Sequence, residues 1–390
     1  MGNFCFDNPK DRRGCYSMKW DVGEGVLPMW VADMDFETAP CVKEAIIKRA
    51  DIGSYGYTYV PEDFYLAVAD FWRRRHGVAF DTGDMVFATG IVPAISSLVR
   101  KLTTPAEKVV IQTPVFDIFF NSIYNNGRYI YESPLKYDGN GYIVDFEDLE
   151  KKLSDPQTTL MILCNPHNPV GKVFTREELC RIGELCKKHG VTVISDEIHC
   201  EFTNPKRSYV PFASVNEVCR DISVSCLSVS KSFNLAGLQG ACVVAHNRAL
   251  YNKVRRALNT DEVAEPNAFV IPAFISALTE GEGWLDEMLD YVFENKRFAT
   301  EYINNNIPGL WVPESAATYL LWVDATSLGI DSERLCDIIM KESSLMLSPG
   351  VHYGAAGEGF LRINLGTSRA KVEEGLKRLK AATDAIKRNG

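Results

Sequence analysis

The sequence predicts an α/β fold with a large domain built on a mostly parallel sheet and a second, smaller α+β domain. Through the middle of the chain, short apolar runs rich in valine, isoleucine and leucine alternate with helical patterns. This alternation is typical of parallel strands that are covered by helices on both faces. The last third instead combines long amphipathic helices with fewer strands. With 390 residues, 46% of them hydrophobic, the chain can bury a large core and form two or three domains.

Six strands are expected in the large domain, each a short apolar run that ends at polar or turn-forming residues. They are residues 85–88, 108–112, 159–164, 191–195, 223–228 and 241–245. One helix is expected over residues 92–101 and another from Thr175 to about His189. The second begins with Thr175-Arg-Glu-Glu178, a capping-box pattern in which the Thr and Glu side chains satisfy free N–H groups of the first turn.

The small domain is expected to contain three helices, at residues 284–305, 332–342 and 368–387, and two strands, at residues 319–323 and 360–365. The first 45 residues precede the α/β pattern, and we expect them to pack with the small domain. The expected division is therefore an N-terminal segment 1–45, a large domain 46–285 and a C-terminal small domain 286–390.

Composition and missing motifs exclude several classes of protein. A net charge of −9 without basic runs argues against nucleic acid as a partner. No apolar run approaches the roughly 18 residues of a membrane span, and the N-terminus lacks the apolar region of a secretory signal. Eleven scattered cysteines without a C-x-x-C pair predict free thiols in a reducing cytoplasm. The motifs of P-loop nucleotide binders, zincins and G-x-S-x-G hydrolases are missing.

Polar residues follow four of the expected strands directly. Gly90 opens a helix, and free N–H groups at such a turn can bind phosphate, although an ordinary strand–helix turn is the alternative. Residues 165–171 form a turn with two Asn-Pro pairs. Asp196-Glu-Ile-His199 ends a buried strand and could belong to a metal site, but no matching ligand cluster is apparent elsewhere. Lys231 follows the next strand, at its buried end. An unpaired charge is costly in such a place, so the pKa of the lysine amine is expected to fall.

These four sites are expected to meet, because ligands bind at the carboxyl edge of the strands in open α/β sheets. Their common ligand would need a phosphate, a ring nitrogen for an acid, a phenolate-like oxygen for a donor and an aldehyde for a lysine. Pyridoxal 5′-phosphate (PLP) has all four groups. The sequence therefore predicts PLP as the cofactor and no metal.

Three segments carry a resemblance to a known family. NPHNPVGKVF (165–174), SDEIH (195–199) and SVSKSFNLAGLQG (228–240) resemble fold-type I PLP enzymes of the aminotransferase class I/II family. Within it, the chain is similar to the MalY/PatB branch of cystathionine β-lyases, or C–S lyases, over nearly its whole length. The resemblance implies a PLP-dependent transferase-like fold whose large domain has a mostly parallel seven-stranded sheet.

The resemblance also implies roles for residues around the cofactor ring. Lys231 would bind the cofactor as a Schiff base and move the proton at the substrate Cα. Asp196 would keep the ring nitrogen protonated, and Asn168 would donate a hydrogen bond to the ring oxygen O3′. His199 stands where many relatives have a tyrosine that also reaches O3′. Phe116 would stack on the ring, at a position where relatives often have tyrosine.

Phosphate binding is implied for the helix-opening turn, two serines and one tyrosine, namely Gly90, Ile91, Val92, Ser228, Ser230 and Tyr57. Tyr57 would reach the phosphate of the neighbouring subunit, which implies a homodimer with shared active sites. The alternative is that the aromatic residues around Tyr57 merely fill a loop of their own chain.

Two further positions concern the substrate and the phosphate charge. Arg362 would clamp the substrate carboxylate in a bidentate pair, with a sheet-edge salt bridge as the alternative. Gln239 stands where aspartate-aminotransferase-like enzymes have an arginine that pairs with the phosphate. The lyase branch also has glutamine at this position. Because glutamine carries no charge to pair with the phosphate, the cofactor is expected to be held less tightly.

The leading functional prediction is a carbon–sulfur β-lyase that acts on a small sulfur amino acid such as cystathionine and releases a thiol, pyruvate and ammonia. A class I/II aminotransferase would use the same residues and is the alternative. A regulatory or binding protein with this fold is a third possibility, weakened because the expected cofactor residues are all present.

Overall fold

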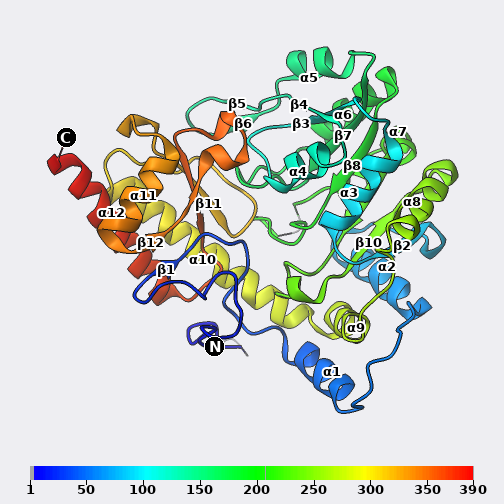
Figure 1. Ribbon diagram of the computed structural model, residues 1–390, viewed down its shortest axis with the longest axis horizontal. Coiled ribbons are helices and arrows are strands. Elements are labelled where there is room, and N and C mark those ends of the chain that lie inside the picture. Colours follow the sequence, from blue (N-terminus) through cyan, green and yellow to red (C-terminus); the bar gives the residue numbers. More distant parts are fainter. Residues whose placement is uncertain (1–3, 207, 390) are drawn as a thin grey trace.

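A seven-stranded sheet forms the centre of the larger part of the molecule (Figure 1). The computed structural model describes residues 4–206 and 208–389. The strand order is β2 (Met85–Ala88), β10 (Ala241–Val244), β9 (Ser223–Leu227), β8 (Thr192–Asp196), β7 (Thr158–Cys164), β3 (Lys108–Ile111) and β4 (Tyr129–Glu132). β10 pairs antiparallel with β2 and β9, and the other neighbouring pairs are parallel. The predicted mostly parallel sheet is confirmed.

Successive side chains of a strand point to opposite faces of the sheet, and helices pack against both faces. In β3, Val109 and Ile111 pack with α3 (Ile91–Leu102), α4 (Ile118–Tyr124) and α8 (Arg248–Thr260). Val110 faces the opposite side and packs with α5 (Phe146–Leu153), α6 (Arg176–His189) and α7 (Glu217–Ile222). Near the β2 edge, α2 (Glu62–His76) and α9 (Val270–Glu280) complete the cover. A sheet covered on both faces needs apolar residues at successive positions, as the sequence has.

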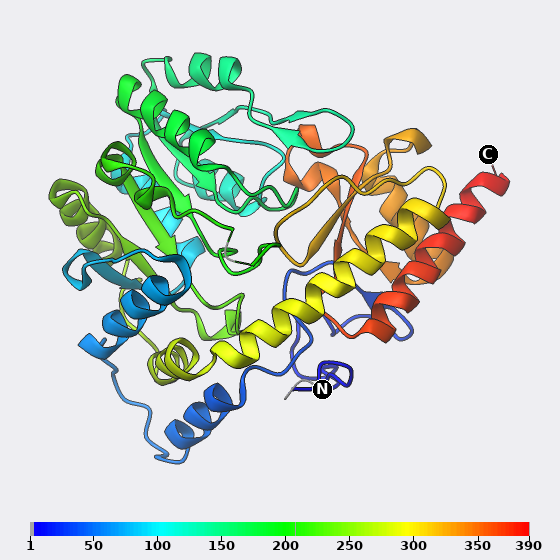
Figure 2. The ribbon, with the colours of Figure 1, turned by 180° about the vertical axis from the view of Figure 1, so that it is seen from behind.

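The smaller part has three long helices and a three-stranded antiparallel sheet of β11 (Leu320–Asp324), β14 (Phe360–Asn364) and β13 (Ser348–Pro349). The helices are α10 (Glu282–Asn306), α11 (Ser332–Ser343) and α12 (Arg369–Asn389). Each predicted element of this part is present to within two residues at either end. α10 extends from the larger part along the smaller one, beside α12 (Figure 2). Because α10 continues from one part into the other, it marks no boundary at residue 285. The division of the chain at residues 45 and 285 stays a prediction.

The N-terminal segment crosses to the smaller part, where β1 (Leu27–Pro28) pairs in parallel with β12 (Leu345–Met346). It then leads into α1 (Pro40–Ala50), and a hairpin of β5 (Lys136–Tyr137) and β6 (Tyr142–Ile143) lies outside the large sheet. Across the described residues, we find no helix with the length and apolar content to cross a membrane.

Candidate active site

A cavity of about 230 Å³ lies at the carboxyl ends of the parallel strands, as the sequence predicted for the ligand site. Nine predicted site residues line it: Gly90, Ile91, Val92, Phe116, Asn168, Asp196, His199, Ser230 and Lys231. They come from the ends of β2, β3, β7, β8 and β9 or from the segments directly after them, so residues far apart in the chain meet at one edge of the sheet.

Lys231 projects from the turn after β9, and its Nζ donates a hydrogen bond to the carbonyl of Ala32. Burial, together with the positive charge of Arg362, lowers the pKa of Lys231 to about 8, although Asp33 and Asp196 act in the opposite direction. An amine with this pKa is partly neutral near physiological pH, and only the neutral form is a nucleophile or base.

Asp196 is the last residue of β8 and is 3% exposed. Strand pairing places it between Cys164 of β7 and Cys226 of β9, so few polar groups surround it. Burial therefore raises the pKa of Asp196 to about 7, while the backbone N–H of Ile198, 3.1 Å from Oδ1, and the charge of Lys231 act against the rise. A protonated nitrogen beside this carboxylate would compensate for the lost solvation.

The N-terminus of α3 also lines the cavity, and its first N–H groups have no carbonyl one turn earlier. Gly90 precedes the helix with φ +130°, a backbone conformation that residues with a Cβ rarely adopt. Ser230 lines the cavity, and its Oγ lies 2.9 Å from Ser228 Oγ, which is 2.7 Å from the Gly240 carbonyl. Ser228 thus lies behind Ser230 and is not on the cavity wall. These donors form a suitable anion site.

Arg362 reaches the site from β14 of the smaller sheet. Its guanidinium donates to the carbonyl of Trp30 at 2.9 Å, lies 3.5 Å from Asn168 Oδ1 and stacks on the Tyr353 ring at 4.7 Å. Among the described residues no carboxylate is within 4.0 Å of it, and its buried Nε has no hydrogen-bond partner. The sheet-edge salt bridge considered as an alternative is therefore not formed, and the charge is available for an anion.

The sequence matches the family aminotransferase class I and II over residues 24–379. It is 41% identical to cystathionine beta-lyase PatB of Bacillus subtilis (strain 168) over 97% of this chain and 99% of PatB. It is 34% identical to protein MalY of Escherichia coli (strain K12) over 98% of this chain and 100% of MalY. Cystalysin from Treponema denticola, whose crystal structure contains PLP, matches with a TM-score of 0.95 and 29% identity, over 98% of this chain and 99% of that chain.

The chain belongs to the aminotransferase class I and II family. The fold is accordingly the PLP-dependent, fold-type I architecture that the sequence motifs predicted.

His199 is buried on the cavity wall, at 2% exposure. Burial and the charges of Lys231, Arg362 and Lys296 lower its pKa to about 3, so the imidazole is neutral. Within the described structure its Nδ1 has no hydrogen-bond partner. The His199 ring is 6.2 Å from the Tyr319 ring, at the side of the cavity. Its proposed contact with O3′ stays a prediction.

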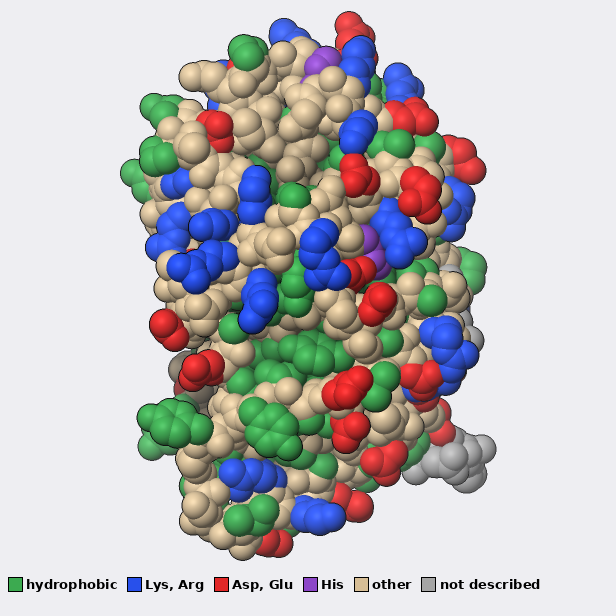
Figure 3. Space-filling model, turned by 90° about the vertical axis from the view of Figure 1, so that its right-hand side faces the viewer, with side chains coloured by type: hydrophobic (Ala, Val, Ile, Leu, Met, Phe, Trp, Pro, Cys, Tyr) green, Lys and Arg blue, Asp and Glu red, His purple; other side chains and the backbone are tan. Residues whose placement is uncertain are grey.

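Tyr57 does not reach the cavity of its own chain. It lies in the segment between α1 and α2 and is fully exposed, as Tyr59 and Tyr55 largely are, at 106%, 80% and 57%. The segment between α1 and α2 runs along the lower right of Figure 1. Figure 3 views the molecule from that right-hand side, and hydrophobic side chains gather on the lower half of this face. An exposed aromatic group of this kind is typical of a protein interface.

Sequence reasoning missed the residues that approach the site from outside the large sheet. The carbonyl of Ala32 accepts hydrogen bonds from both Lys231 and the Tyr319 hydroxyl, and Asn364 Nδ2 donates to the carbonyl of Asp33 at 2.6 Å. No local pattern signals these contacts, because the partners are about 200 to 330 positions apart. Their segments WVADMDFETAP (30–40), TYLLWVD (318–324) and FLRINLG (360–366) support the family resemblance but assign no role to Ala32, Tyr319 or Asn364.

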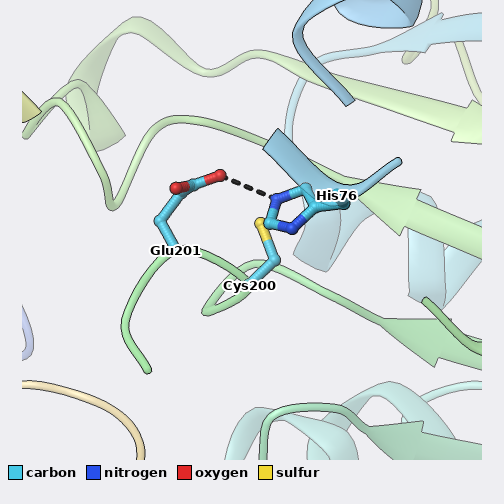
Figure 4. A group of neighbouring side chains, drawn as sticks. All are labelled: His76, Cys200 and Glu201. Atoms are coloured by element: carbon cyan, nitrogen blue, oxygen red, sulfur yellow. Dashed lines mark hydrogen bonds and ion pairs between the residues drawn. The ribbon is translucent and has the colours of Figure 1, made fainter. Parts of the chain in front are cut away.

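Behind His199, three potential metal ligands lie together, namely His76, Cys200 and Glu201 (Figure 4). His76 Nε2 is 2.8 Å from Glu201 Oε1, and Arg75 Nε is 2.6 Å from Glu201 Oε2. The guanidinium already engages the second carboxylate oxygen and would repel a metal ion. We therefore interpret the group as a buried ion-pair network that joins the segment after β8 to the end of α2.

Proposed function

We propose that this protein is a PLP-dependent carbon–sulfur β-lyase that cleaves L-cystathionine or a related cysteine S-conjugate to a thiol, pyruvate and ammonia. The observation that carries the proposal is the cavity that Lys231, with its lowered pKa, lines together with Asp196 and the N-terminus of α3. The names of PatB, a cystathionine beta-lyase, and of the PLP-bound C-S lyase from Staphylococcus hominis support the lyase, since they match 97% and 98% of this chain.

The residues of the cavity fit PLP. Backbone N–H groups and Ser230 suit a phosphate at one end, and the buried carboxylate of Asp196 suits a protonated ring nitrogen at the other. Two buried nitrogens, His199 Nδ1 and Arg362 Nε, lack a hydrogen-bond partner in the described structure, so added polar groups would satisfy them. When bound, PLP supplies an aldehyde for amines and a ring that takes up the electron pair left at Cα.

Lys231 would act as the covalent anchor and as the base at Cα. Because its pKa is about 8, it can accept a proton near neutral pH and return it, which suits general acid–base catalysis. Asp196 would hold a proton on the ring nitrogen through an ion pair that offsets its own buried charge. Asn168, 3% exposed on the cavity wall, would donate its amide N–H to O3′.

Arg362 would bind and orient the substrate carboxylate. A carboxylate offers a charge-assisted pair of hydrogen bonds, stronger than the neutral Trp30 carbonyl that the guanidinium contacts at 2.9 Å. Fixing the carboxylate and the amine leaves the Cα–H bond as the group that Lys231 can reach. In the overall reaction the Cα–H and Cβ–S bonds break, the thiolate leaves with the C–S electron pair and is protonated, and water supplies the keto oxygen of pyruvate as ammonia departs.

A class I/II aminotransferase is the second candidate, since the family itself carries that activity in its name. The same lysine, aspartate and arginine would serve, but the amino group would pass to a keto acid. The two functions therefore differ in whether turnover depends on a keto acid.

The lyase is tested by incubating PLP-loaded protein with L-cystathionine and measuring pyruvate and thiol, with and without an added keto acid. We expect equal amounts of both products without the keto acid, and none from a Lys231→Ala control. If the added keto acid is instead converted to its amino acid while neither pyruvate nor thiol is released, the protein is an aminotransferase. A panel including L-cystine and other thioether amino acids would then rank substrates.

We also propose a homodimer in which Tyr57 of each subunit completes the partner's phosphate site. The exposure of Tyr57 and of its aromatic neighbours supports an interface at this segment. A cytoplasmic location is proposed as well, because all eleven cysteines are free and six of them are buried in the core.

A further inference from the structure

Lys296 is a buried lysine of α10 that the proposed chemistry does not use. It is 5% exposed, and its Nζ donates to Ser315 Oγ at 2.7 Å, to the carbonyl of Thr318 at 3.1 Å and to the carbonyl of Ala317. In the described part of the chain no carboxylate lies within 4.0 Å of this ammonium. All three ammonium hydrogens therefore have neutral acceptors in a single short segment.

Keeping such a group inside the protein is costly. Burial alone lowers the pKa of Lys296 to about 7, because no counterion offsets the lost hydration. A leucine or methionine would fill the same space without this cost. The three hydrogen bonds to one segment indicate that the ammonium is retained to fix the backbone there.

The segment that Lys296 holds, residues 315–319, joins the smaller part of the molecule to the large one. The N–H groups of Ala316 and Ala317 both donate to the Gly171 carbonyl at 2.9 Å, and Thr318 N–H donates to the Phe202 carbonyl at 2.8 Å. Gly171 has φ +70°, and a Cβ there would fall 1.8 Å from Ser315 Oγ. The contact is therefore close and leaves no room for a larger residue.

Thr318 adopts φ +63°, a left-handed conformation that is strained for a β-branched residue and needs external support. Lys296 gives that support, since its Nζ binds the carbonyls of Thr318 and of the preceding residue. The next residue, Tyr319, has its ring 4.7 Å from the Phe202 ring and donates its hydroxyl to the Ala32 carbonyl at 2.8 Å. That carbonyl also accepts from Lys231.

We propose that Lys296 is a positioning residue that fixes the strained backbone at Thr318 and so holds Tyr319 against His199 and Ala32 of the cavity wall. Its charge contributes to keeping His199 neutral as well. The inference rests on the proposed PLP chemistry, but it concerns a residue that touches neither cofactor nor substrate.

The test compares PLP-loaded Lys296→Met and Lys296→Arg enzymes with wild type. Arg297→Met is the matched control, because Arg297 is the next residue of α10 and is exposed. The readouts are the visible circular dichroism band of the cofactor and kcat, both per mole of bound cofactor, and KM for L-cystathionine. Normalising to cofactor separates positioning from loss of folded protein.

We expect the methionine variant to lose at least half of the dichroism band and about 10- to 100-fold in kcat. KM should stay within about twofold, because Arg362 keeps the carboxylate site. The arginine variant, which retains charge and donors, should recover most of the band. If Lys296→Met does not fold, Lys296→Gln is used instead, because glutamine retains N–H donors without the charge. We expect this variant also to lose dichroism intensity and kcat.

The proposal is overturned if the foldable variant matches Arg297→Met in both readouts. Failure of the proposed function is distinguishable, because wild-type enzyme would then release no thiol while its dichroism band still reports on the Lys296 variants.

Discussion

The half-buried Lys231 and the buried Lys296 both have a lowered pKa, but their surroundings give them different tasks. Lys231 lines the cavity together with Asp196, and its pKa is about 8. Lys296 has a pKa of about 7, yet its three hydrogen bonds point at one backbone segment and it does not line the cavity. Perturbed pKa values alone would not tell the nucleophile from the structural amine. Their positions relative to the cavity distinguish the two lysines, because only Lys231 lines it.

The pKa of Lys231 predicts how cofactor uptake depends on pH. Only the neutral amine attacks an aldehyde, so the rate at which cofactor-free protein binds PLP should rise about tenfold per pH unit below 8 and level off above it. An ordinary lysine would level off only near 10.5. Stopped-flow absorbance of the bound cofactor from pH 6 to 10 gives the midpoint. A midpoint near 10.5 would contradict the lowered pKa.

Arg362 is predicted to select substrates that carry a carboxylate. Removing it deletes a charge-assisted bidentate contact worth about 1.5–3 kcal/mol. Arg362→Ala should therefore lose about 10- to 150-fold in kcat/KM for L-cystathionine while its cofactor absorbance stays unchanged. Arg248→Ala, at an exposed arginine, is the control. Unchanged kcat/KM in the Arg362 variant would mean that the carboxylate is held elsewhere.

The site could be predicted where its residues sit in local patterns. Asp196 and Lys231 follow apolar runs that could only be buried strands, and the topology of parallel strands brings their ends together. Ala32 and Tyr319 carry no such signal, since their contact joins positions 287 apart. The Ala32 group that accepts these hydrogen bonds is a backbone carbonyl, which every residue type has. The identity of residue 32 therefore could not indicate the contact.

At the scale of elements, prediction succeeded where a strand or helix is defined by its own residues. The helix expected from Thr175 to about His189 is α6, and its capping box is present, with Glu178 N–H 3.1 Å from Thr175 Oγ1. The antiparallel direction of β10 was not predicted, because strand direction depends on the connections rather than on the apolar run. The edge strand β4 was missed because its residues YIYE are only partly buried.

The capping box of α6 is predicted to contribute measurably to stability. Thr175→Ala removes an acceptor for a first-turn N–H group and should lower the free energy of unfolding by about 1 kcal/mol. Thr175→Ser keeps the hydroxyl and is the control. Urea unfolding of both variants, followed by circular dichroism, measures the difference. Equal midpoints for the Ala and Ser variants would show that the hydroxyl contributes nothing.

At the scale of the whole molecule, the single chain leaves its aromatic segment around Tyr57 without cover. The proposed homodimer predicts a mass about twice 43.6 kDa by light scattering. It also predicts complementation between Lys231→Ala and Tyr57→Phe subunits, because one site of the mixed dimer combines Lys231 with the partner's Tyr57. Random mixing should restore up to about a quarter of wild-type activity. An active monomer would contradict the dimer.

The central claim is that Lys231 anchors the cofactor at the edge of the large sheet, and a covalent label tests it most directly. Borohydride reduction of the PLP-loaded protein, followed by digestion and peptide mass mapping, locates the modified lysine. We predict a pyridoxyl group on the peptide that contains Lys231 and none on the peptide that contains Lys296, although both amines have a lowered pKa. A label on Lys296, or on any lysine outside the cavity, would contradict the account.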